Sequence, residues 1–529
     1  MSTIVIGSGI SGSNVALSLL EKGEAVELWD FGKQENLNTY NDKNFIDFKK
    51  NLQNSSEVLI GNNKKSFPTP VNQKLFEIPP LRNFILDNNT INNQFSELNN
   101  FDIYQSFNEG GLANGWGANC IPYNENEISD WNLDYNEFNS SQKKIFDELN
   151  VSKVKDNINT NFNFSDFGTE KAITLDERDN HFLNKFSQNY NFFSNEKFEI
   201  GKARLAIKNS STEDSCKLTS RCLWGCPQKA IYNPLHHTLK KCRSFKQFKY
   251  FNNRKVSHFN LKDGNINEII FHVDEIEKKE KVYKKVFLCA GAIQSGIIFN
   301  KTCLKNEIDF GKITTGLMDT KKIKIVYLLP KMIKKKIDYR SVQFNRLIGA
   351  MNEKYHGINE YIHLEFLHLN SLFYQPLINN LPLPLRLSKN LFYSLFSSLG
   401  VCTYFLPDRL SDQNKIKFNS NTKKFEINYT ENKDKILLDK KIEKRIKRYL
   451  IRLSAIPIKT IRYNPGAAIH YAGTIPLGNA DKYPVNSFGK VKFINNLLVA
   501  DASAMPKLSS KPVSINAASY GDYVVQKNI

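Results

Sequence analysis

The chain opens on an apolar strand that runs directly into a glycine-rich turn. Residues 1–12 are MSTIVIGSGISG, a sequence that gives Gly7, Gly9 and Gly12 a Gly-x-Gly-x-x-Gly spacing. Gly7 permits the tight turn out of the strand, Gly9 lets the backbone approach a pyrophosphate, and Gly12 lets the following helix pack on the sheet. The pattern predicts that the first unit of the fold binds a nucleotide.

The residues that follow complete a strand–helix–strand unit. We expect a helix from about Ser13 to Lys22, whose amino-terminal N–H groups and positive dipole end face the phosphates. A second apolar run, Ala25 to Trp29, ends at Asp30, whose carboxylate is placed to accept hydrogen bonds from ribose hydroxyls. This order of elements makes the nucleotide site a stronger prediction than the glycine spacing alone.

Length and charge limit the class of protein. A chain of 529 residues exceeds one ordinary core, so we expect two closely joined domains. The first strand begins almost at the initiator Met and no apolar run is long enough to span a bilayer, which favours a cytoplasmic protein. The net charge is +20, but the basic residues are dispersed, which indicates a solvated surface rather than a nucleic-acid site.

Two segments add detail to the surface. Residues 440–452 are strongly basic and carry Ile442, Ile446, Leu450 and Ile451 near helical spacing, which predicts a surface helix packed on the body. The uncharged segment from Leu391 to Leu406 is too short to span a bilayer. It favours a buried or cleft-lining helix, and a peripheral membrane contact stays open.

Cysteine spacing gives no metal site. Among the eight cysteines, four lie in one short region, but their C-x5-C-x3-C-x15-C spacing matches no standard ligand pattern. Without a secretory signal we expect reduced thiols and no bound metal. The four residues are Cys216, Cys222, Cys226 and Cys242.

The rest of the chain indicates a discontinuous α/β domain and a second domain. A strand at Lys285 to Ala290 leads through Gly291 into a helix, which returns the chain to the nucleotide-binding sheet. Alternating strand patterns after residue 311 predict an antiparallel domain that covers the substrate. We therefore expect a nucleotide-binding domain at 1–310 and 462–529, with surface insertions at about 33–100 and 125–200, and a substrate-binding domain at 311–461.

The carboxyl-terminal motifs carry a resemblance to a known family. His470 begins HYAGTIPLG, a later stretch from Asn496 is NLLVADASAMP, and Lys511-Pro512 follows it. Together with the first glycine turn, the segment from Gly110 to Gly117 and Ala290-Gly291-Ala292, these motifs resemble the glucose-methanol-choline (GMC) family of FAD-dependent oxidoreductases. The Trp-Gly and Cys-x3-Cys-Pro features look most like its sugar dehydrogenase and pyranose oxidase branches.

This resemblance implies a Rossmann-like FAD-binding domain, an antiparallel α+β substrate domain and a set of cofactor contacts. The FAD would be noncovalent, because the segment from Asn114 to Trp116 lacks the histidine to which some relatives attach it. The implied cofactor-binding residues are Gly7, Gly9 and Gly12 at the pyrophosphate, Asp30 at the adenosine ribose, Gly110, Gly111 and Asn114 along the flavin and its phosphate arm, Val256 near the adenine, Ala290 and Gly291 at the second strand–helix junction, and Asp501 and Ala502 near the ribityl chain and pyrophosphate.

The resemblance also implies two catalytic residues. His470 matches the family's catalytic histidine, and imidazole suits the role, because oxidation of an alcohol by hydride transfer to flavin N5 requires a base for the hydroxyl proton. Lys511 stands where the family usually has a second His or an Asn. A protonated lysine there would stabilise an anionic reduced flavin or bind an anionic substrate group.

We therefore expect an FAD-dependent dehydrogenase or oxidase that acts on a CH–OH group of a sugar, polyol or glycan precursor. A lipid or sterol-like alcohol is the alternative if the segment from Leu391 to Leu406 lines an apolar channel. A catalytically silent flavin-binding scaffold is the alternative that Lys511 suggests. Oxygen, a quinone or a protein remains open as the electron acceptor.

Overall fold

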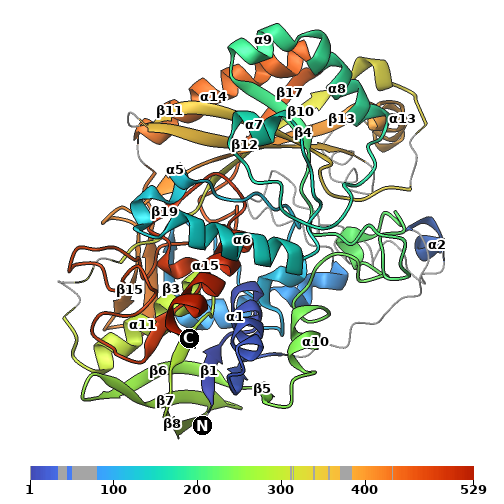
Figure 1. The fold of residues 1–529 in the computed structure, drawn as a ribbon. Coiled ribbons are helices and arrows are strands. Elements are labelled where there is room, and N and C mark those ends of the chain that lie inside the picture. Colours follow the sequence, from blue (N-terminus) through green and yellow to red (C-terminus); the bar gives the residue numbers. More distant parts are fainter. Residues whose placement is uncertain are drawn as a thin grey trace.

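A computed structural model shows that the protein has two layered halves (Figure 1). The lower half contains a parallel sheet and the upper half an antiparallel sheet. The described residues are 2–33, 45–50, 80–309, 313, 315–336, 340–355, 358–369, 384–431 and 433–529. Much of the insertion predicted at 33–100 therefore lies outside the described residues, at 34–44 and 51–79.

The lower half is built on a five-stranded parallel sheet in the order β18-β9-β1-β2-β5. Its strands are β1 (Thr3–Ile6), β2 (Val26–Trp29), β5 (Phe248–Phe251), β9 (Val286–Leu288) and β18 (Leu497–Val499). The glycine turn leads into α1 (Ile10–Glu21), where the Ser18 hydroxyl donates to Asp522 of the last helix, α15 (Val513–Asn528), over 2.6 Å. The two ends of the chain therefore form one layer, as the discontinuous domain requires.

The upper half is a six-stranded antiparallel sheet in the order β17-β10-β13-β12-β11-β4. Its strands are β4 (Phe198–Lys202), β10 (Lys321–Leu328), β11 (Leu347–Tyr355), β12 (Ile358–His368), β13 (Leu399–Leu406) and β17 (Ile456–Arg462). Helices α8 (Glu177–Gln188), α9 (Tyr190–Asn195) and α14 (Lys433–Arg452) cover one face and share a buried core with it. The other face is turned toward the parallel half, and this arrangement positions the site.

Two segments join a different half from the one expected. β4 pairs with β11 of the antiparallel sheet, although residues 125–200 were expected as an insertion of the nucleotide-binding domain. Strands β15 (Lys415–Asn419) and β16 (Lys424–Asn428) extend from β3 (Phe95–Asn99) and pack into the core of the parallel half, although their residues fall within the range 311–461 expected for the substrate-binding domain. An alternating pattern identifies a strand but does not indicate which sheet it joins.

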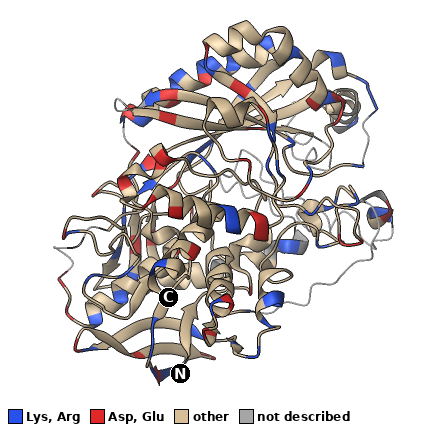
Figure 2. Cartoon of the chain, viewed as in Figure 1, with Lys and Arg blue, Asp and Glu red and all other residues tan. Residues whose placement is uncertain are grey.

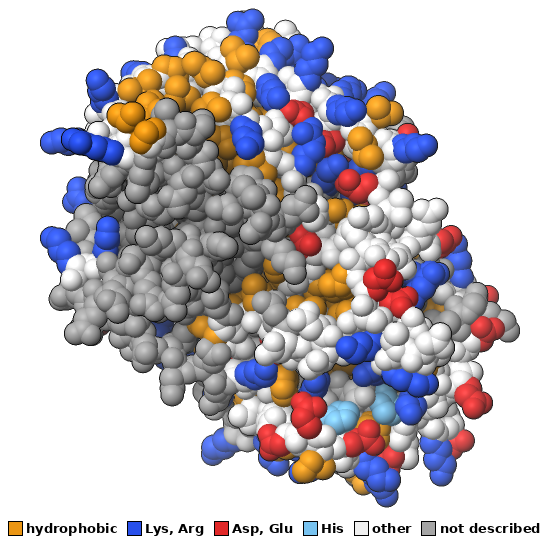
Figure 3. All heavy atoms as spheres, turned by 180° about the vertical axis from the view of Figure 1, so that it is seen from behind, with side chains coloured by type: hydrophobic (Ala, Val, Ile, Leu, Met, Phe, Trp, Pro, Cys, Tyr) orange, Lys and Arg blue, Asp and Glu red, His pale blue; other side chains and the backbone are white. Residues whose placement is uncertain are grey.

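The uncharged segment is only partly helical. It contains the end of α13 (Leu385–Leu395), a short turn and the whole of β13, an inner strand that pairs with β10 and β12. The predicted helix is therefore wrong over residues 399–406, because a short run of buried apolar residues suits an inner strand as well as a helix. Figure 3 shows apolar side chains gathered on the rear face of the upper half, among Lys and Arg.

The basic helix is confirmed as α14, with Ile442, Ile446 and Leu450 buried and Ile451 63% exposed. Figure 2 shows Lys and Arg scattered over both halves and interspersed with Asp and Glu. Among the described residues, no helix has the length and apolar character needed to cross a membrane. The remaining longer elements are α2 (Phe45–Lys50), α4 (Asn88–Gln94), α5 (Glu125–Ile128), α6 (Tyr135–Glu148), α7 (Asn157–Asn161), α10 (Thr238–Cys242), β6 (Lys255–Lys262), β7 (Asn265–Val273), β8 (Ile276–Lys281) and α11 (Ala292–Lys305).

Candidate active site

A cavity of about 480 Å³ lies between the two halves. On one side it is lined by residues that follow the parallel strands, which are Gly7 and Gly9 after β1, Asp30 after β2, Gly291 after β9 and Asp501 after β18. The crevice outside the carboxyl ends of parallel strands is where open α/β sheets bind ligands. On the other side the cavity is lined by β10, β12 and β13 of the antiparallel sheet.

The first glycine turn fits a phosphate group. A Cβ on Gly9 would meet no protein atom within 4 Å, so this glycine leaves space on the cavity side rather than space for packing. Gly9 is also the N-cap of α1 and supplies no side-chain acceptor to the first-turn amides. Those amides and the helix dipole suit an anion. A Cβ on Gly12 would lie 1.9 Å from the Gly7 carbonyl oxygen, so Gly12 serves packing, and it does not line the cavity.

The two predicted acids both line the cavity, and both carboxylates accept hydrogen bonds from within the protein. Asp30 accepts hydrogen bonds from the Ser8 hydroxyl and, over 3.3 Å, from the Tyr250 hydroxyl, and burial raises its pKa to about 7. Asp501 accepts from Gly291 N (2.8 Å) and from the Ser295 hydroxyl (2.6 Å), so its carboxylate joins the end of β18 to the start of α11. Asp501 and Ala502 line the cavity, but the Asp501 carboxylate is engaged within the protein.

The glycine-rich segment is divided between cavity lining and support. Gly111 lines the cavity, as do Val256 and Ala290. Gly110 and Asn114 do not: the Gly110 amide donates to the Ser8 hydroxyl, and the Asn114 amide donates to the Glu109 and Gly111 carbonyls over 2.8 and 2.9 Å. These hydrogen bonds hold the segment against the first turn, and the contact of Gly110 and Asn114 with the cofactor stays a prediction.

His470 lines the same cavity as the glycine turn. Its Nδ1 lies 2.7 Å from the Thr320 hydroxyl, and its ring stacks on Phe405 with centroids 5.3 Å apart. Since Nδ1 is engaged, Nε2 is the nitrogen available to a substrate. Burial lowers the pKa of His470 to about 4, so the imidazole is neutral and able to accept a proton at neutral pH.

Asp319, next to Thr320 in the chain, fixes the backbone that carries His470. Its carboxylate accepts from the amides of Gly466 (2.8 Å), Ala468 (3.3 Å) and His470 (2.7 Å). Between them Ile469 has a φ of +62°, a conformation that is strained for a β-branched residue and persists only where the surroundings hold it. Two consecutive residues therefore position His470: Asp319 fixes the backbone of its loop, and Thr320 fixes the orientation of its imidazole ring.

We expect Asp319→Ala to lower the rate of substrate oxidation by about tenfold to a hundredfold while FAD is retained. The reason is that the loop loses three amide acceptors and the strained backbone can relax, which displaces the imidazole. Anaerobic stopped-flow absorbance of bound FAD measures the rate, and Asp412→Ala, an exposed acid, is the matched control. A rate equal to that of the unaltered protein would contradict the positioning role of Asp319.

Lys511 does not face the cavity. Its ammonium is fully buried, donates to the Pro122 carbonyl over 2.8 Å and to the Glu127 carboxylate, and lies 4.0 Å from the centre of the Phe164 ring. Its neighbour Pro512 lines the cavity instead. The ion pair with Glu127 thus directs the side chain away from the position that the resemblance implied, although burial does lower the pKa of Lys511 to about 8.

We expect Lys511→Met to destabilise the fold by about 3–5 kcal/mol, because it leaves the Glu127 carboxylate buried without its cation. Denaturant unfolding measures the change, and the double variant Lys511→Met/Glu127→Gln should recover much of it. Loss of activity at unchanged stability would instead return Lys511 to the catalytic machinery.

The antiparallel wall of the cavity holds residues that the sequence analysis did not identify. Strand β10 alternates, so Ile323 and Ile325 pack under the helices while Lys322 and Lys324 line the cavity. Strand register then defines two rows across β10, β13 and β12, which are Lys322, Phe405 and His363, and Lys324, Thr403 and Glu365. The alternation of lysine with isoleucine in β10 was the available signal.

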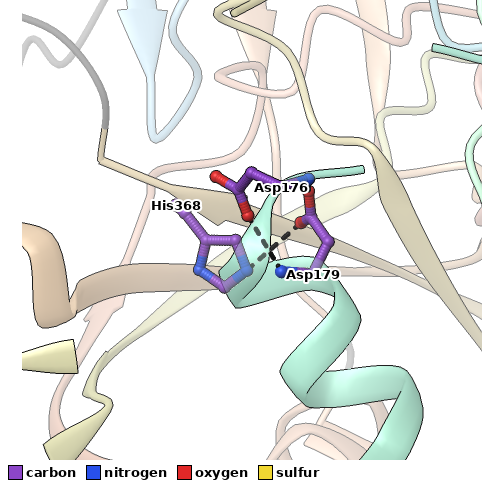
Figure 4. Close-up of side chains that lie close together, drawn as sticks. All are labelled: Asp176, Asp179 and His368. Atoms are coloured by element: carbon purple, nitrogen blue, oxygen red, sulfur yellow. Dashed lines mark hydrogen bonds and ion pairs between the residues drawn. The ribbon is translucent and has the colours of Figure 1, made fainter. Parts of the chain in front are cut away.

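One cluster of possible metal ligands lies in the antiparallel half and contains none of the cysteines. Within the described part of the chain, only Asp176, Asp179 and His368 bring three possible metal ligands together (Figure 4), and the four clustered cysteines form no such group. Arg346 reaches both carboxylates, over 2.5 and 2.7 Å, and Arg178 pairs with Asp176 over 2.7 Å. The two acids are therefore neutralised by arginines, and the cluster is an ion-pair network that anchors the start of α8.

Comparison with known proteins gives a family match for the carboxyl-terminal segment and a common fold for the whole chain. Residues 442–521 match the family model of the GMC oxidoreductases. Three similar structures each share 12% sequence identity: a pyridoxine 4-oxidase from Mesorbium loti (TM-score 0.63, covering 99% of this chain and 98% of that one), an FAD-dependent oxidoreductase from Chaetomium thermophilum (0.59, 100% and 99%) and a formate oxidase from Aspergillus oryzae (0.63, 99% and 97%). No curated protein matches the sequence.

Proposed function

We propose that this chain, whose carboxyl-terminal segment is that of a GMC oxidoreductase and whose fold is that of FAD-dependent oxidoreductases, oxidises a CH–OH group of a sugar, polyol or glycan precursor, with His470 as the base. A GMC-type FAD-dependent oxidoreductase is supported by the family match of the carboxyl-terminal segment and by a similar fold along nearly the whole chain. The sugar branch of the family and the electron acceptor remain predictions.

One observation carries the proposal: the phosphate-binding turn and a neutral, engaged histidine line one cavity. The residues present fit FAD, because Gly9 leaves its Cβ space open at the amino terminus of α1 and Asp30 stands at the end of β2. When bound, FAD supplies the two-electron acceptor for the hydride that leaves the carbinol carbon.

The chain's own residues supply the proton transfer. His470 Nε2 accepts the proton of the substrate hydroxyl as the C–H bond breaks and the C=O bond forms. Thr320 holds Nδ1 and so fixes which nitrogen is free, while Asp319 fixes the loop. The stacking of His470 on Phe405 limits rotation of the ring.

A polar substrate is favoured over a lipid alcohol. The lipid alternative depended on an apolar channel lined by the segment from Leu391 to Leu406, yet only Thr403 and Phe405 of that segment line the cavity among its described residues. The same wall presents Lys322, Lys324 and Glu365, whose charges suit hydroxyl-rich or ionic ligands.

The test is an anaerobic screen of purified holoprotein against sugars, polyols, sugar acids and lipid alcohols. We expect loss of the visible absorbance of bound FAD with a sugar or polyol derivative and none with lipid alcohols. Yellow protein that no member of the panel bleaches would support the flavin-binding scaffold instead.

A further inference from the structure

We propose that Glu365 and Asn119 form a specificity subsite, in which Glu365 Oε2 and Asn119 Oδ1 accept hydrogen bonds from hydroxyl groups of a neutral polyol other than the hydroxyl that is oxidised. This inference rests on the proposed function and narrows the substrate class for the same cavity. Both residues line the cavity that His470 lines. They come from distant parts of the chain, because Glu365 belongs to β12 and Asn119 follows the glycine-rich segment.

Strand alternation brings Glu365 to the cavity. Ile362, Leu364 and Phe366 of β12 are buried in the core that the antiparallel sheet shares with its helices. Successive side chains of a strand point to opposite faces of the sheet, so the residues between these three face the other way. Glu365 and Leu367 accordingly line the cavity. The strand therefore supplies one acidic side chain to an otherwise apolar stretch.

Asn119 holds the carboxylate of Glu365 in one orientation. The Asn119 Nδ2 donates to Glu365 Oε1 over 2.8 Å, and the same nitrogen lies 3.1 Å from His363 Nε2. His363 Nε2 is itself 3.5 Å from Glu365 Oε1. Because a carboxylate only accepts hydrogen bonds, the amide nitrogen of Asn119 must face Glu365. The protein's own contacts therefore set the direction of both acceptor groups.

One oxygen of each side chain has no donor within the described chain. Glu365 meets Asn119 and His363 through Oε1, so Oε2 receives no hydrogen bond from the described residues. Asn119 is only 5% exposed, and its Oδ1 is buried with no hydrogen-bond partner among those residues. A buried acceptor without a donor is costly, and a ligand that supplies donors relieves the cost.

These donors cannot come from the hydroxyl that is oxidised. A hydroxyl group carries one proton, and in the proposed reaction this proton goes to His470. The substrate must therefore carry further hydroxyl groups on other carbons. The subsite lies in the same part of the cavity as the base, because the Phe405 ring stacks with His470 (centroids 5.3 Å apart) and with His363 (6.0 Å). This arrangement suits the hydroxyls of one small polyol.

The charges of this wall favour a neutral donor. Burial would raise the pKa of Glu365, but the hydrogen bond and the charge of His363 and the hydrogen bond from Asn119 lower it. The charge of Lys322, which lines the same cavity, also lowers it, so the carboxylate is ionised. A substrate ammonium would be repelled by Lys322, and a substrate anion would be repelled by Glu365. A hydroxyl donates to the carboxylate without adding charge.

The experiment compares matched alcohols in the holoprotein. Glucose, galactose, glucitol and myo-inositol are the polyol probes, cyclohexanol carries a single hydroxyl, and glucosamine and glucuronate are the charged probes. We expect at least one polyol to exceed cyclohexanol and both charged probes in kcat/KM by about tenfold or more. Glu365→Gln keeps the shape but replaces an acceptor oxygen with an amide donor. It should raise KM for that polyol about tenfold with little change in kcat, and should leave kcat/KM for cyclohexanol within about twofold.

A second variant and a control accompany it. Asn119→Ala removes the other acceptor and should raise KM for the polyol in the same way. Glu97→Gln, at an exposed acid of β3 that does not line the cavity, should leave the substrate preferences unchanged. FAD content and the unfolding midpoint of each variant establish that the fold is retained. A fall in kcat for every alcohol alike, at unchanged KM, would contradict a specificity role.

Binding to the His470→Ala variant separates this inference from the proposed function. Calorimetric titration of that variant with the same probes reads ligand preference without turnover. Tighter binding of a polyol than of cyclohexanol and the charged probes, lost in His470→Ala/Glu365→Gln, supports the inference even if no probe is oxidised. Absence of preference for any polyol, tighter binding of a charged probe, or a preference that survives in the double variant would overturn it.

Discussion

His470→Ala should slow the oxidation of substrate by about a hundredfold to ten-thousandfold while the protein still purifies with FAD. The imidazole is the neutral base of the cavity, and its removal leaves the hydroxyl proton without an acceptor as the C–H bond breaks. Its contacts are with Thr320 and Phe405 rather than with the glycine turn, so cofactor binding should persist. Anaerobic absorbance after rapid mixing with substrate measures the rate.

The pH profile makes this prediction more specific. An ordinary histidine titrates near 6.5, whereas burial lowers the pKa of His470 to about 4. The rate in the unaltered protein should therefore be level between pH 6 and 8 and fall only on approach to pH 4, where the imidazole gains its proton. His272→Ala, on β7 and outside the cavity lining, is the matched control. A His470→Ala protein that oxidises substrate at the original rate would exclude the assigned role.

The strands and helices near the nucleotide-binding turn could be predicted from sequence because their signals are local. The turn after β1, the helix that follows it and Gly291 between β9 and α11 combine backbone requirements with apolar runs. Strand partners could not be predicted in this way. β4 and β16 show ordinary strand patterns, and their sheets are fixed by contacts with residues more than a hundred positions away.

The same limit applies to the site. His470 was identified because the residues around it form a motif, and it lies in the cavity. Lys511 also stands in a motif, yet Glu127, almost four hundred residues earlier, draws its side chain away. Asp319 lies in no motif, and its role depends on three backbone amides of a distant loop. A motif therefore indicates where a residue lies along the chain and near which site. The direction of its side chain depends on partners that the motif does not contain.

Alanine substitutions at Gly9 and Gly12 of the first turn should have different effects, one on cofactor binding and the other on the fold. Gly9 has a φ of −61°, which alanine also adopts, and its Cβ would enter space that no protein atom occupies within 4 Å. We expect Gly9→Ala to lower the unfolding free energy of the apoprotein by less than about 1 kcal/mol, as a cap substitution does, and to raise the dissociation constant of FAD about tenfold or more. The added methyl group occupies space that the phosphate needs.

Gly12→Ala should act on the fold instead. Its Cβ would lie 1.9 Å from the Gly7 carbonyl oxygen and 3.1 Å from Cys289 Cβ, so α1 must move away from the turn and from β9. Overpacking of this kind costs about 3 kcal/mol, and the displaced helix terminus also loses FAD. Denaturant unfolding of both apoproteins and fluorescence titration with FAD separate the two effects. If Gly9→Ala destabilised the apoprotein as much as Gly12→Ala, the open space at Gly9 would not be a cofactor site, and the assignment of the cavity to FAD would lose its main structural support.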